Sequence, residues 1–478
     1  MAVPSYEFFA FAAVVALVIN LSRSGGWRRG VLLVANLAFA ATFSHDAAAL
    51  VPFAALLVLG FACVKLLERR PGRALFVASM IVLCAAFFWL KRYAFVPPAL
   101  FLQYAYVTAG TSYVFFRILH LVIDTYQRAL PERIGALSYA NYTLNFTALV
   151  SGPIQLYRDY RRTESEQPAA LTEATAGAAL ERIVLGTFKV WVLAPLVYGC
   201  FERAAGAVAP DAAPPASAAS AGLAIGLYPL FLYLNFSGYT DAVIGVARFL
   251  RLELPENFDR PFLAHGYLEF WSRWHMTLSN WLKTYVYSPL LLALMHRFPA
   301  RRAEPYLGVF AYFVTFFLVG AWHGQTTLFL VFGVLQGLGV SLNKLYQIVL
   351  SRRLGRARYR ALCAQPAYAA LSRGATYGYY AFSSLWFWSS WPQLARGAAA
   401  LGPLGAVAAL ALVVAAATVL LAALARLDAA VRGALETHRG VTRYRYARTA
   451  WAAALLVVTL SLTVVLSAPA PAIVYRAF

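Results

Sequence analysis

Apolar runs long enough to cross a lipid bilayer recur along most of the chain. The hydrocarbon core of a bilayer takes about 20 residues of α-helix. Runs of this kind lie near 4–21, 31–43 (short), 47–67, 74–90, 99–123, 178–200, 221–249, 306–322, 325–343, 374–392, 399–425 and 449–468. They predict an all-α, polytopic membrane protein with about 11–12 transmembrane helices.

Loops rich in basic residues alternate with loops that have few. This pattern is typical of membrane proteins, whose cytoplasmic loops are enriched in lysine and arginine. Seven alternate loops hold 32 of the 41 basic residues: 21–30, 65–73, 126–137, 157–163, 251–305, 343–373 and 426–448. No basic residue precedes the first apolar run, and Arg23 follows it. We therefore expect a first span with its N-terminus outside, not a cleaved signal peptide.

Two stretches do not follow the pattern of simple spans. Residues 137–156 are only moderately apolar, contain Gly152-Pro153 and have basic loops on both sides, which favours a re-entrant or shallow segment. Residues 255–300 are too polar to span. Aromatic and apolar residues recur there at three- and four-residue intervals: Trp271, Trp274, Leu278, Trp281 and Tyr285. This spacing predicts one continuous amphipathic helix at the inner membrane face.

The composition agrees with a membrane protein and excludes several classes of function. The chain is 61% hydrophobic and 13% charged, with a mean hydropathy of +0.63. Its net charge of +21 follows from the basic loops, so we expect no nucleic-acid partner. The four cysteines stand singly, which predicts neither disulfides nor a metal site. The motifs of serine hydrolases, P-loop NTPases, zincins and dinucleotide-binding enzymes are missing.

A histidine inside an apolar region is the first candidate for chemistry. From Tyr306 to Asn343 the chain has no Asp, Glu, Lys or Arg, and its one imidazole is His323. Gly320 and Gly324 bracket it, which predicts a turn between two apolar runs. At about 1.5 Å per residue, it lies about 25 Å from the cytoplasmic edge. A histidine that only caps a carbonyl is the structural alternative.

Three further residues are candidates because of where they lie. His275 is predicted at the border between the aromatic stripe and the polar face of its helix, where a solvated interfacial histidine is the alternative. Asn235 and Asp241 lie in an otherwise apolar span, so the carboxylate should have a partner. Helix packing is the alternative role for both.

The remaining histidines are interpreted as structural. His120 and Asp124 share a helix face at i and i+4, one residue short of the His-x4-Asp spacing of glycerolipid acyltransferases. Four others stand in loops without companions: His45, His265, His296 and His438.

Several motifs together resemble one known family. They are Gly-Thr-Ser-Tyr-Val-Phe-Phe-Arg (110–117), Ser-Gly-Pro-Ile (151–154), Asn-Phe-Ser-Gly-Tyr-Thr-Asp (235–241), Leu-Pro-Glu-Asn-Phe-Asp-Arg-Pro-Phe-Leu (254–263), Phe-Trp-Ser-Arg-Trp-His-Met-Thr-Leu-Ser-Asn-Trp-Leu (270–282) and Gly-Ala-Trp-His-Gly (320–324). In this order they resemble the bacterial membrane-bound O-acyltransferase (MBOAT) family. The match runs from about residue 105 to 345.

The resemblance implies a single polytopic domain over 1–478. Its helices would form a ring with re-entrant and interfacial helices around a central funnel. The catalytic core would be 105–345, including interfacial helices at 255–300, and the peripheral helices would be 1–100 and 372–478. The implied location is the bacterial inner membrane, with a periplasmic N-terminus.

The resemblance also implies the reaction. An acyl group leaves a cytosolic thioester, either acetyl-CoA or an acyl-loaded carrier protein, and is esterified to a hydroxyl of an extracytoplasmic polymer. His323 is the implied base and His275 the second essential histidine. Supporting or channel positions are Trp322, Gly324, Arg273, Trp274, Asn235, Asp241 and Tyr239. Implied partners are membrane lipid, the acyl donor, an envelope polysaccharide and a periplasmic acyltransferase. No metal or bound cofactor is expected.

Two branches of the family fit the motifs. One exports acetyl groups to exopolysaccharide, and the other exports D-alanine to teichoic acid. The alanine- and arginine-rich composition favours a GC-rich, Gram-negative source and therefore acetyl. The chain ends Tyr-Arg-Ala-Phe, similar to a small partner protein of the teichoic acid system, so Tyr475 is a candidate acyl relay. The alternative is an interfacial aromatic anchor.

Two other classes of function remain as alternatives. A transporter or flippase for envelope polymer precursors also has many spans with intramembrane His and Asp, although the sequence lacks the internal repeats of such carriers. A passive scaffold of an envelope synthase complex would tolerate replacement of both histidines.

Overall fold

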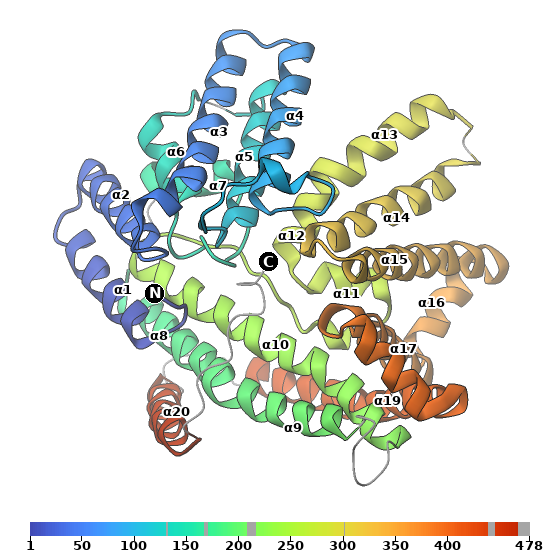
Figure 1. Cartoon of the computed structure of the whole chain (residues 1–478). Helices are drawn as coiled ribbons and strands as arrows, with labels where there is room; N and C mark the ends of the chain where they lie inside the picture. The colour runs from blue at the N-terminus through green and yellow to red at the C-terminus, as the bar shows by residue number, and fades with distance from the viewer. Residues whose placement is uncertain (131, 167–170, 208–216, 301, 438–444, 467–478) are drawn as a thin grey trace. The chain divides into compact units, whose positions relative to one another are not determined.

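The computed structural model describes residues 1–130, 132–166, 171–207, 217–300, 302–437 and 445–466, and every regular element in them is helical (Figure 1). Seven helices or helix runs among these residues are long and apolar enough to cross a membrane: Ala47–Arg69, Arg73–Leu90, Glu173–Gly206, Ala218–Phe249, Glu304–His323, Thr327–Leu354 and Trp391–Ala430. Two shorter apolar helices, Tyr6–Ile19 and Thr449–Val464, coincide with further predicted spans. The prediction of an all-α, polytopic membrane protein is confirmed.

The chain forms two compact units. One contains residues 1–192, 235–255 and 449–478, and the other contains residues 193–234 and 256–448. Helix α10 (Ala218–Phe249) contributes its first part to the second unit and its remainder to the first. The prediction of one family domain over 1–478 stays a prediction.

The first unit is built around a helix that is buried on all sides. It contains α1 (Tyr6–Ile19), α2 (Gly25–Ala41), α3 (Val51–Arg69), α4 (Arg73–Leu90), α5 (Thr111–Tyr126), α6 (Ala136–Thr143), α7 (Tyr157–Arg161) and α8 (Glu173–Phe188). Every residue of α5 from Thr111 to Ile123 is buried, because α3, α4 and α6 pack against it. A Cβ atom on Gly60 of α3 would lie 2.6 Å from Ile118 of α5. Glycine therefore permits the closest approach of these two helices.

One predicted span in the first unit is shorter than expected. The apolar run 99–123 becomes a helix only from Thr111. Prolines at 97 and 98 precede the irregular stretch, and Gly110 adopts a left-handed conformation with φ of 75°. A Cβ atom at Gly110 would lie 2.7 Å from the carbonyl oxygen of Leu149, so only glycine fits there. Proline and this turn keep residues before 111 out of the helix.

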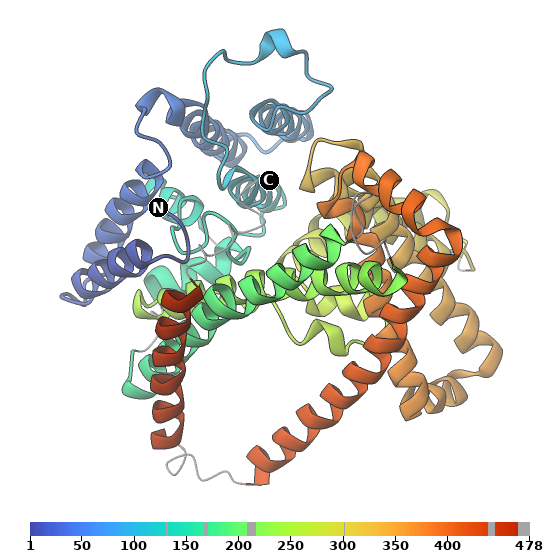
Figure 2. The same ribbon diagram turned by 60° about the horizontal axis from the view of Figure 1, so that its bottom comes forward.

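The second unit carries both candidate histidines. It contains α9 (Ala194–Gly206), α11 (Tyr267–Arg273), α12 (Met276–Leu282), α13 (Ser288–Arg297), α14 (Glu304–His323), α15 (Thr327–Leu354), α16 (Arg356–Ala364), α17 (Pro366–Ser383), α18 (Leu385–Trp388) and α19 (Trp391–Thr437). Helices α17 and α19 pack closely (Figure 2). At Gly374 of α17 a Cβ atom would lie 1.9 Å from the Thr418 hydroxyl of α19.

The segment 137–156 is not a span. It forms α6 and then an irregular stretch that is almost wholly buried. The guanidinium of Arg117, itself 1% exposed, donates to the carbonyl oxygens of Thr143 and Ala148 at 3.0 and 2.6 Å. Buried carbonyls outside a helix need donors of this kind, and Arg117 supplies them from α5.

Candidate active site

His323 is the last residue of α14, at the turn into α15. The two helices run alongside each other (Figure 1), and glycines make the approach close: a Cβ atom on Gly320 would lie 2.3 Å from the Cα atom of Gly333. Gly324 ends α14, and a Cβ atom there would lie 2.1 Å from the ring of Phe329. The predicted turn is confirmed, and its glycines are required by steric contact.

Aromatic rings enclose the imidazole of His323. The side chain is 3% exposed, and ring centroids of Trp322, Phe332 and Phe387 lie 4.6, 5.8 and 5.0 Å from it. Phe387 comes from α18, a four-residue helix inside the run 374–392, which was predicted as one span but is interrupted after Ser383. An imidazole in such a site is shielded from bulk water, so a proton that it accepts must come from a molecule inside the site.

His275 lies at a break between two helices. The single helix predicted over 271–285 is wrong, because α11 ends at Arg273 and α12 begins at Met276. Trp274 is extended, and His275 is left-handed with φ of 44°. The break arises because Asp259 N–H donates to the carbonyl oxygen of Arg273 at 2.9 Å. A tertiary contact with the 254–263 segment thus replaces the helical hydrogen bonds.

His275 is buried and not, as predicted, at the edge of a polar face. It is 1% exposed, and its Nδ1 lies 3.2 Å from Oδ1 of Asn257. The same Oδ1 accepts the backbone N–H of Thr277 at 3.1 Å and the Thr277 hydroxyl at 2.8 Å. An atom that accepts a backbone N–H must be the amide oxygen, so Nδ1 of His275 carries the proton.

The electrostatics of His275 follow from its burial. Desolvation lowers the pKa of this imidazole to about 3, so it is neutral at physiological pH. With the proton on Nδ1, the lone pair is on Nε2. His275 can therefore accept a hydrogen bond or a proton at Nε2.

His323 and Trp274, the residue before His275, pack against neighbouring positions on one stretch of chain. Trp274, 1% exposed, packs on Tyr380 near the end of α17 at 5.2 Å, and His323 packs on Phe387 of the following helix. Two buried hydrogen bonds hold this stretch against α11 and α15. Tyr267 donates to Gln336 Oε1, and Gln336 Nε2 donates to the Ser383 hydroxyl at 2.9 Å.

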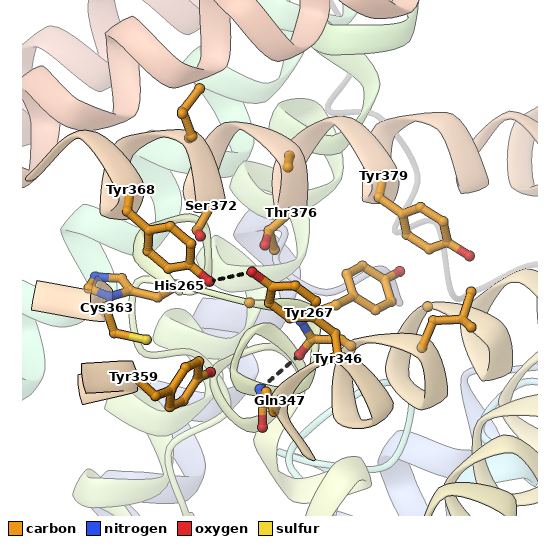
Figure 3. A pocket seen from close by; sticks show the side chains of 16 residues that line it. His265, Tyr267, Tyr346, Gln347, Tyr359, Cys363, Tyr368, Ser372, Thr376 and Tyr379 are labelled. Atoms are coloured by element: carbon orange, nitrogen blue, oxygen red, sulfur yellow. Dashed lines mark hydrogen bonds between the residues drawn. The ribbon is translucent and has the colours of Figure 1, made fainter. Parts of the chain in front are cut away.

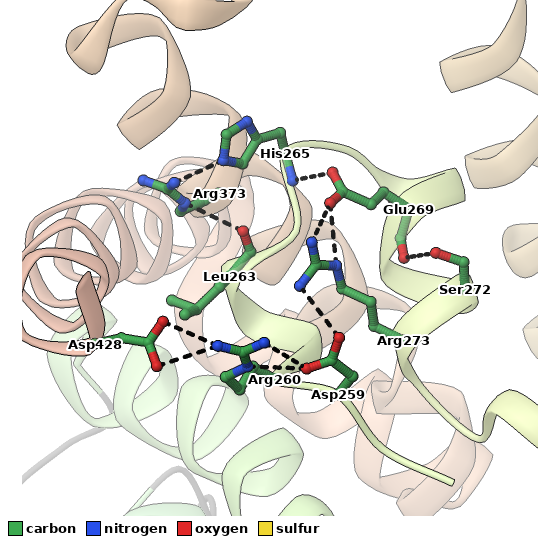
Figure 4. A network of polar contacts seen from close by, with 9 residues as sticks. All are labelled: Asp259, Arg260, Leu263, His265, Glu269, Ser272, Arg273, Arg373 and Asp428. Atoms are coloured by element: carbon green, nitrogen blue, oxygen red, sulfur yellow. Dashed lines mark hydrogen bonds and ion pairs between the residues drawn. The ribbon is translucent and has the colours of Figure 1, made fainter. Parts of the chain in front are cut away.

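Arg273 belongs to a polar network beside the helix break (Figure 4). It forms an ion pair with Glu269 at 2.7 Å and lies 3.9 Å from Asp259. Arg260 links the same network to Asp428 of α19 at 3.1 Å. Arg273 therefore supports the segment that carries His275.

The prediction that His265 has no companions is wrong. Its backbone N–H donates to Glu269, and its Nε2 accepts from Nη2 of Arg373 at 2.6 Å (Figure 4). Spacing along the chain gave no signal of this contact, because 108 residues separate the two side chains.

Asn235, Tyr239 and Asp241 belong to the other unit. The predicted partner of Asp241 is confirmed, since its carboxylate pairs with Arg182 at 3.0 Å and with Lys189 at 2.7 Å. The Tyr239 hydroxyl accepts the N–H of Ser151 at 3.2 Å, and Asn235 is fully buried. These contacts connect α10 to α8 and to the 151–154 motif.

Two other residues of the sequence analysis have different outcomes. His120 is fully buried, and its Nε2 accepts the backbone N–H of Tyr157 at 3.1 Å, which agrees with a structural role. The candidate relay Tyr475 lies outside the described residues. Among the described residues, no group of three or more His, Cys, Asp and Glu side chains could hold a metal ion.

Comparison with known proteins identifies relatives that act on envelope polymers. The family model for the membrane-bound O-acyltransferase family matches residues 102–371. The probable alginate O-acetylase AlgI of Pseudomonas syringae pv. tomato is 26% identical over 245 residues, which are 51% of this chain and 44% of that protein. The teichoic acid D-alanyltransferase of Bacillus subtilis is 24% identical over 350 residues, 69% of this chain and 85% of that protein.

A third relative is similar over a shorter stretch. The peptidoglycan O-acetyltransferase of Helicobacter pylori is 38% identical over 120 residues, 25% of this chain and 21% of that protein. The chain spans about half the length of the alginate O-acetylases that it matches.

Proposed function

Because the chain belongs to the membrane-bound O-acyltransferase family, whose model matches more than half of its residues, we propose that it is an O-acyltransferase that uses His323 as its base. The enzyme moves an acyl group, acetyl in the favoured form, from a cytosolic thioester to a hydroxyl of an extracytoplasmic polymer. We assign the base to His323 because it lies inside the range matched by the family model and is buried among aromatic rings at the turn between α14 and α15.

The chemistry requires one base and one leaving group. The polymer hydroxyl attacks the thioester carbonyl, and its proton passes to the imidazole of His323. The C–S bond then breaks, the ester forms, and the proton leaves with the sulfur as a free thiol. A neutral imidazole suits this task, and its removal costs about 10²–10⁴ in rate. The aromatic enclosure of His323 supports the proposal, because it excludes water that would hydrolyse the thioester.

His275 is proposed as the second essential histidine. Its pKa of about 3 makes it a poor proton donor at neutral pH, because almost no imidazolium is present. It acts through the Nε2 lone pair as an acceptor for a hydroxyl or amide N–H of a substrate. Asn257 positions the ring by holding the Nδ1 proton. Trp274, Trp322, Gly324 and Arg273 support the two histidines.

The acyl group is proposed to be acetyl, with D-alanine as the alternative. The relatives divide between O-acetylases and D-alanyltransferases. The donor is acetyl-CoA or an acyl-loaded carrier protein, and the acceptor is an exopolysaccharide or another envelope glycan, with a periplasmic acyltransferase as a further partner. The basic loops support an inner-membrane protein with a periplasmic N-terminus. A second form of the proposal uses Tyr475 as a relay: its hydroxyl first takes the acyl group from the thioester, and the polymer hydroxyl then takes the acyl group from the tyrosine ester.

The test is mass spectrometry of base-released acyl groups from envelope polymers. A deletion strain is complemented with wild type, with His323→Ala, or with His45→Ala, an exposed loop histidine that serves as the matched control. We expect wild type and His45→Ala to restore the ester, whereas His323→Ala is inserted in the membrane and inactive. Normal acylation by His323→Ala would refute the proposed role of His323. Restored polymer export without any ester would favour a transporter.

A further inference from the structure

A pocket of about 540 Å³ is lined by residues of α11, α15, α16 and α17 (Figure 3). Neither histidine of the proposed site is among its lining residues. Its size falls in the range of small-ligand sites. Tyrosine rings supply much of its wall, among them Tyr346, Tyr359 and Tyr368. The hydroxyls of Tyr346 and Tyr368 lie 3.0 Å apart. The pocket therefore combines an apolar aromatic interior with phenolic donors.

The pocket lies along α15 from the middle of the helix onward, whereas His323 precedes the first residue of this helix. The helix begins at Thr327, next to His323, and contributes Asn343, Tyr346 and Gln347 to the pocket. At about 1.5 Å per residue, these positions are about 24–30 Å from Thr327 along the axis, close to the thickness of the hydrocarbon core. The pocket thus lies at the membrane face of the basic 343–373 loop, which the charge pattern assigns to the cytoplasm.

The chain segment that supplies most of the pocket carries charge of a single sign. From Pro305 to Leu427 the sequence contains no aspartate or glutamate. Helix α16 begins directly beyond α15 and carries Arg356, Arg358 and Arg360, all exposed. At about 100° per residue, Arg356 and Arg360 lie within about 60° of the pocket residue Cys363 around the helix axis.

A partly exposed contact places a positive charge beside the pocket residue His265. Arg373 donates to the pocket residue His265, whose Nε2 is therefore unprotonated, and also to the carbonyl oxygen of Leu263 at 3.2 Å. Burial and the neighbouring guanidinium lower the pKa of His265. Glu269 interacts with both Arg273 and Arg373, so two guanidinium groups share this one carboxylate.

We propose that this pocket, together with the arginines of α16, binds an anionic phospholipid of the cytoplasmic leaflet. The phosphate would meet Arg356 and Arg360, and the upper part of an acyl chain would enter the space between the tyrosine rings. Basic pockets between helices at the cytoplasmic face are suited to anionic headgroups, and arginine binds phosphate in a bidentate manner. The proposal does not depend on the acyl-transfer reaction.

The test measures lipid retained by the full chain after extraction from nanodiscs of equal parts phosphatidylglycerol and phosphatidylcholine. Native mass spectrometry should show phosphatidylglycerol bound to wild type in preference to phosphatidylcholine. The double variant Arg356→Gln/Arg360→Gln should retain at least about tenfold less phosphatidylglycerol. Each arginine near an anionic lipid surface strengthens binding severalfold, and the variant removes two of them. Ala375→Trp, which fills the pocket without removing charge, should also lose the lipid.

Arg69→Gln/Arg70→Gln is the matched control, because it removes two exposed arginines from another predicted cytoplasmic loop. It should retain phosphatidylglycerol as wild type does. Equal retention by Arg356→Gln/Arg360→Gln, or an equal loss in the control, would overturn the proposal. Displacement of the lipid by inorganic phosphate at equal concentration would also overturn it, because the site would then recognise phosphate without the lipid chains.

Discussion

Asn257 and His275, 18 residues apart in sequence, are joined through Oδ1 and Nδ1 at 3.2 Å, and this contact determines which ring nitrogen of the histidine carries the proton. The amide oxygen also caps α12 through Thr277. The Asn257 side chain thus caps the helix that follows the break and also orients the imidazole of His275. Asn257 therefore affects both the protonation of His275 and the stability of α12. Different substitutions of Asn257 should separate these two effects.

Replacing Asn257 should change how activity depends on pH. Asn257→Asp keeps an oxygen acceptor for Nδ1–H and Thr277 N–H but adds a negative charge, which stabilises the imidazolium and raises the pKa of His275 from about 3. Activity should then fall as the pH decreases through the raised pKa, whereas wild type should show no acid limb from this group above pH ~5. Membrane vesicles assayed for ester formation across pH provide the measurement.

Asn257→Ala provides the comparison for that experiment. It leaves Thr277 N–H without its cap and Nδ1–H without its acceptor, which should lower stability by about 1–2 kcal/mol and activity by about tenfold at every pH. If Asn257→Asp and Asn257→Ala have the same pH profile, Asn257 has only a structural role.

The protonation of His275 should contribute to acid sensitivity of the fold. The unfolded chain binds a proton near the ordinary histidine pKa of about 6.5, whereas the folded pKa is about 3. The unfolded state binds more protons between these values, so stability is full above pH ~6.5 and is lost as the pH falls. His275→Asn, which tolerates the left-handed backbone, should flatten this dependence. Thermal unfolding in detergent measures it, and His45→Asn should follow wild type.

A methyl group at Gly324 should damage the site more than the fold. A Cβ atom there would lie 2.1 Å from the ring of Phe329, which must shift the turn that carries His323. Gly324→Ala should reduce activity by about 10²-fold, because a displacement of about 1 Å is enough for such a loss. Adding Phe329→Leu should recover part of the activity. If Phe329→Leu restores no activity and the Gly324→Ala protein is not folded, the glycine is needed only for stability.

The ion pairs of Asp241 should support stability. Asp241→Asn leaves Arg182 and Lys189, both partly buried, without a carboxylate, and should destabilise the protein by about 1–3 kcal/mol after allowance for their partial exposure. Arg162→Met is the control, because it removes a pair with Glu253 whose two side chains are 55% and 40% exposed. Thermal unfolding of the purified variants measures both, and an equal effect in the two would contradict the prediction.

Local patterns predicted much of the fold and part of the site. The length of apolar runs predicted most helices, because the cost of unpaired backbone groups in lipid requires helices wherever such runs cross. Glycines on both sides of His323 predicted its turn, and an aspartate in an apolar span predicted partners. Periodicity over 271–285 predicted one helix and missed the break at His275, since that break depends on the 254–263 segment.

The sequence by itself determined that this is a helical membrane protein with one histidine at an apolar turn, because hydropathy, charge in loops and glycine positions act locally along the chain. Only the tertiary structure decided the tautomer of His275, the enclosure of His323 by Phe387 and the pairing of His265 with Arg373. These features arise from side chains that lie far apart in sequence, and their contacts exist only once the helices have packed.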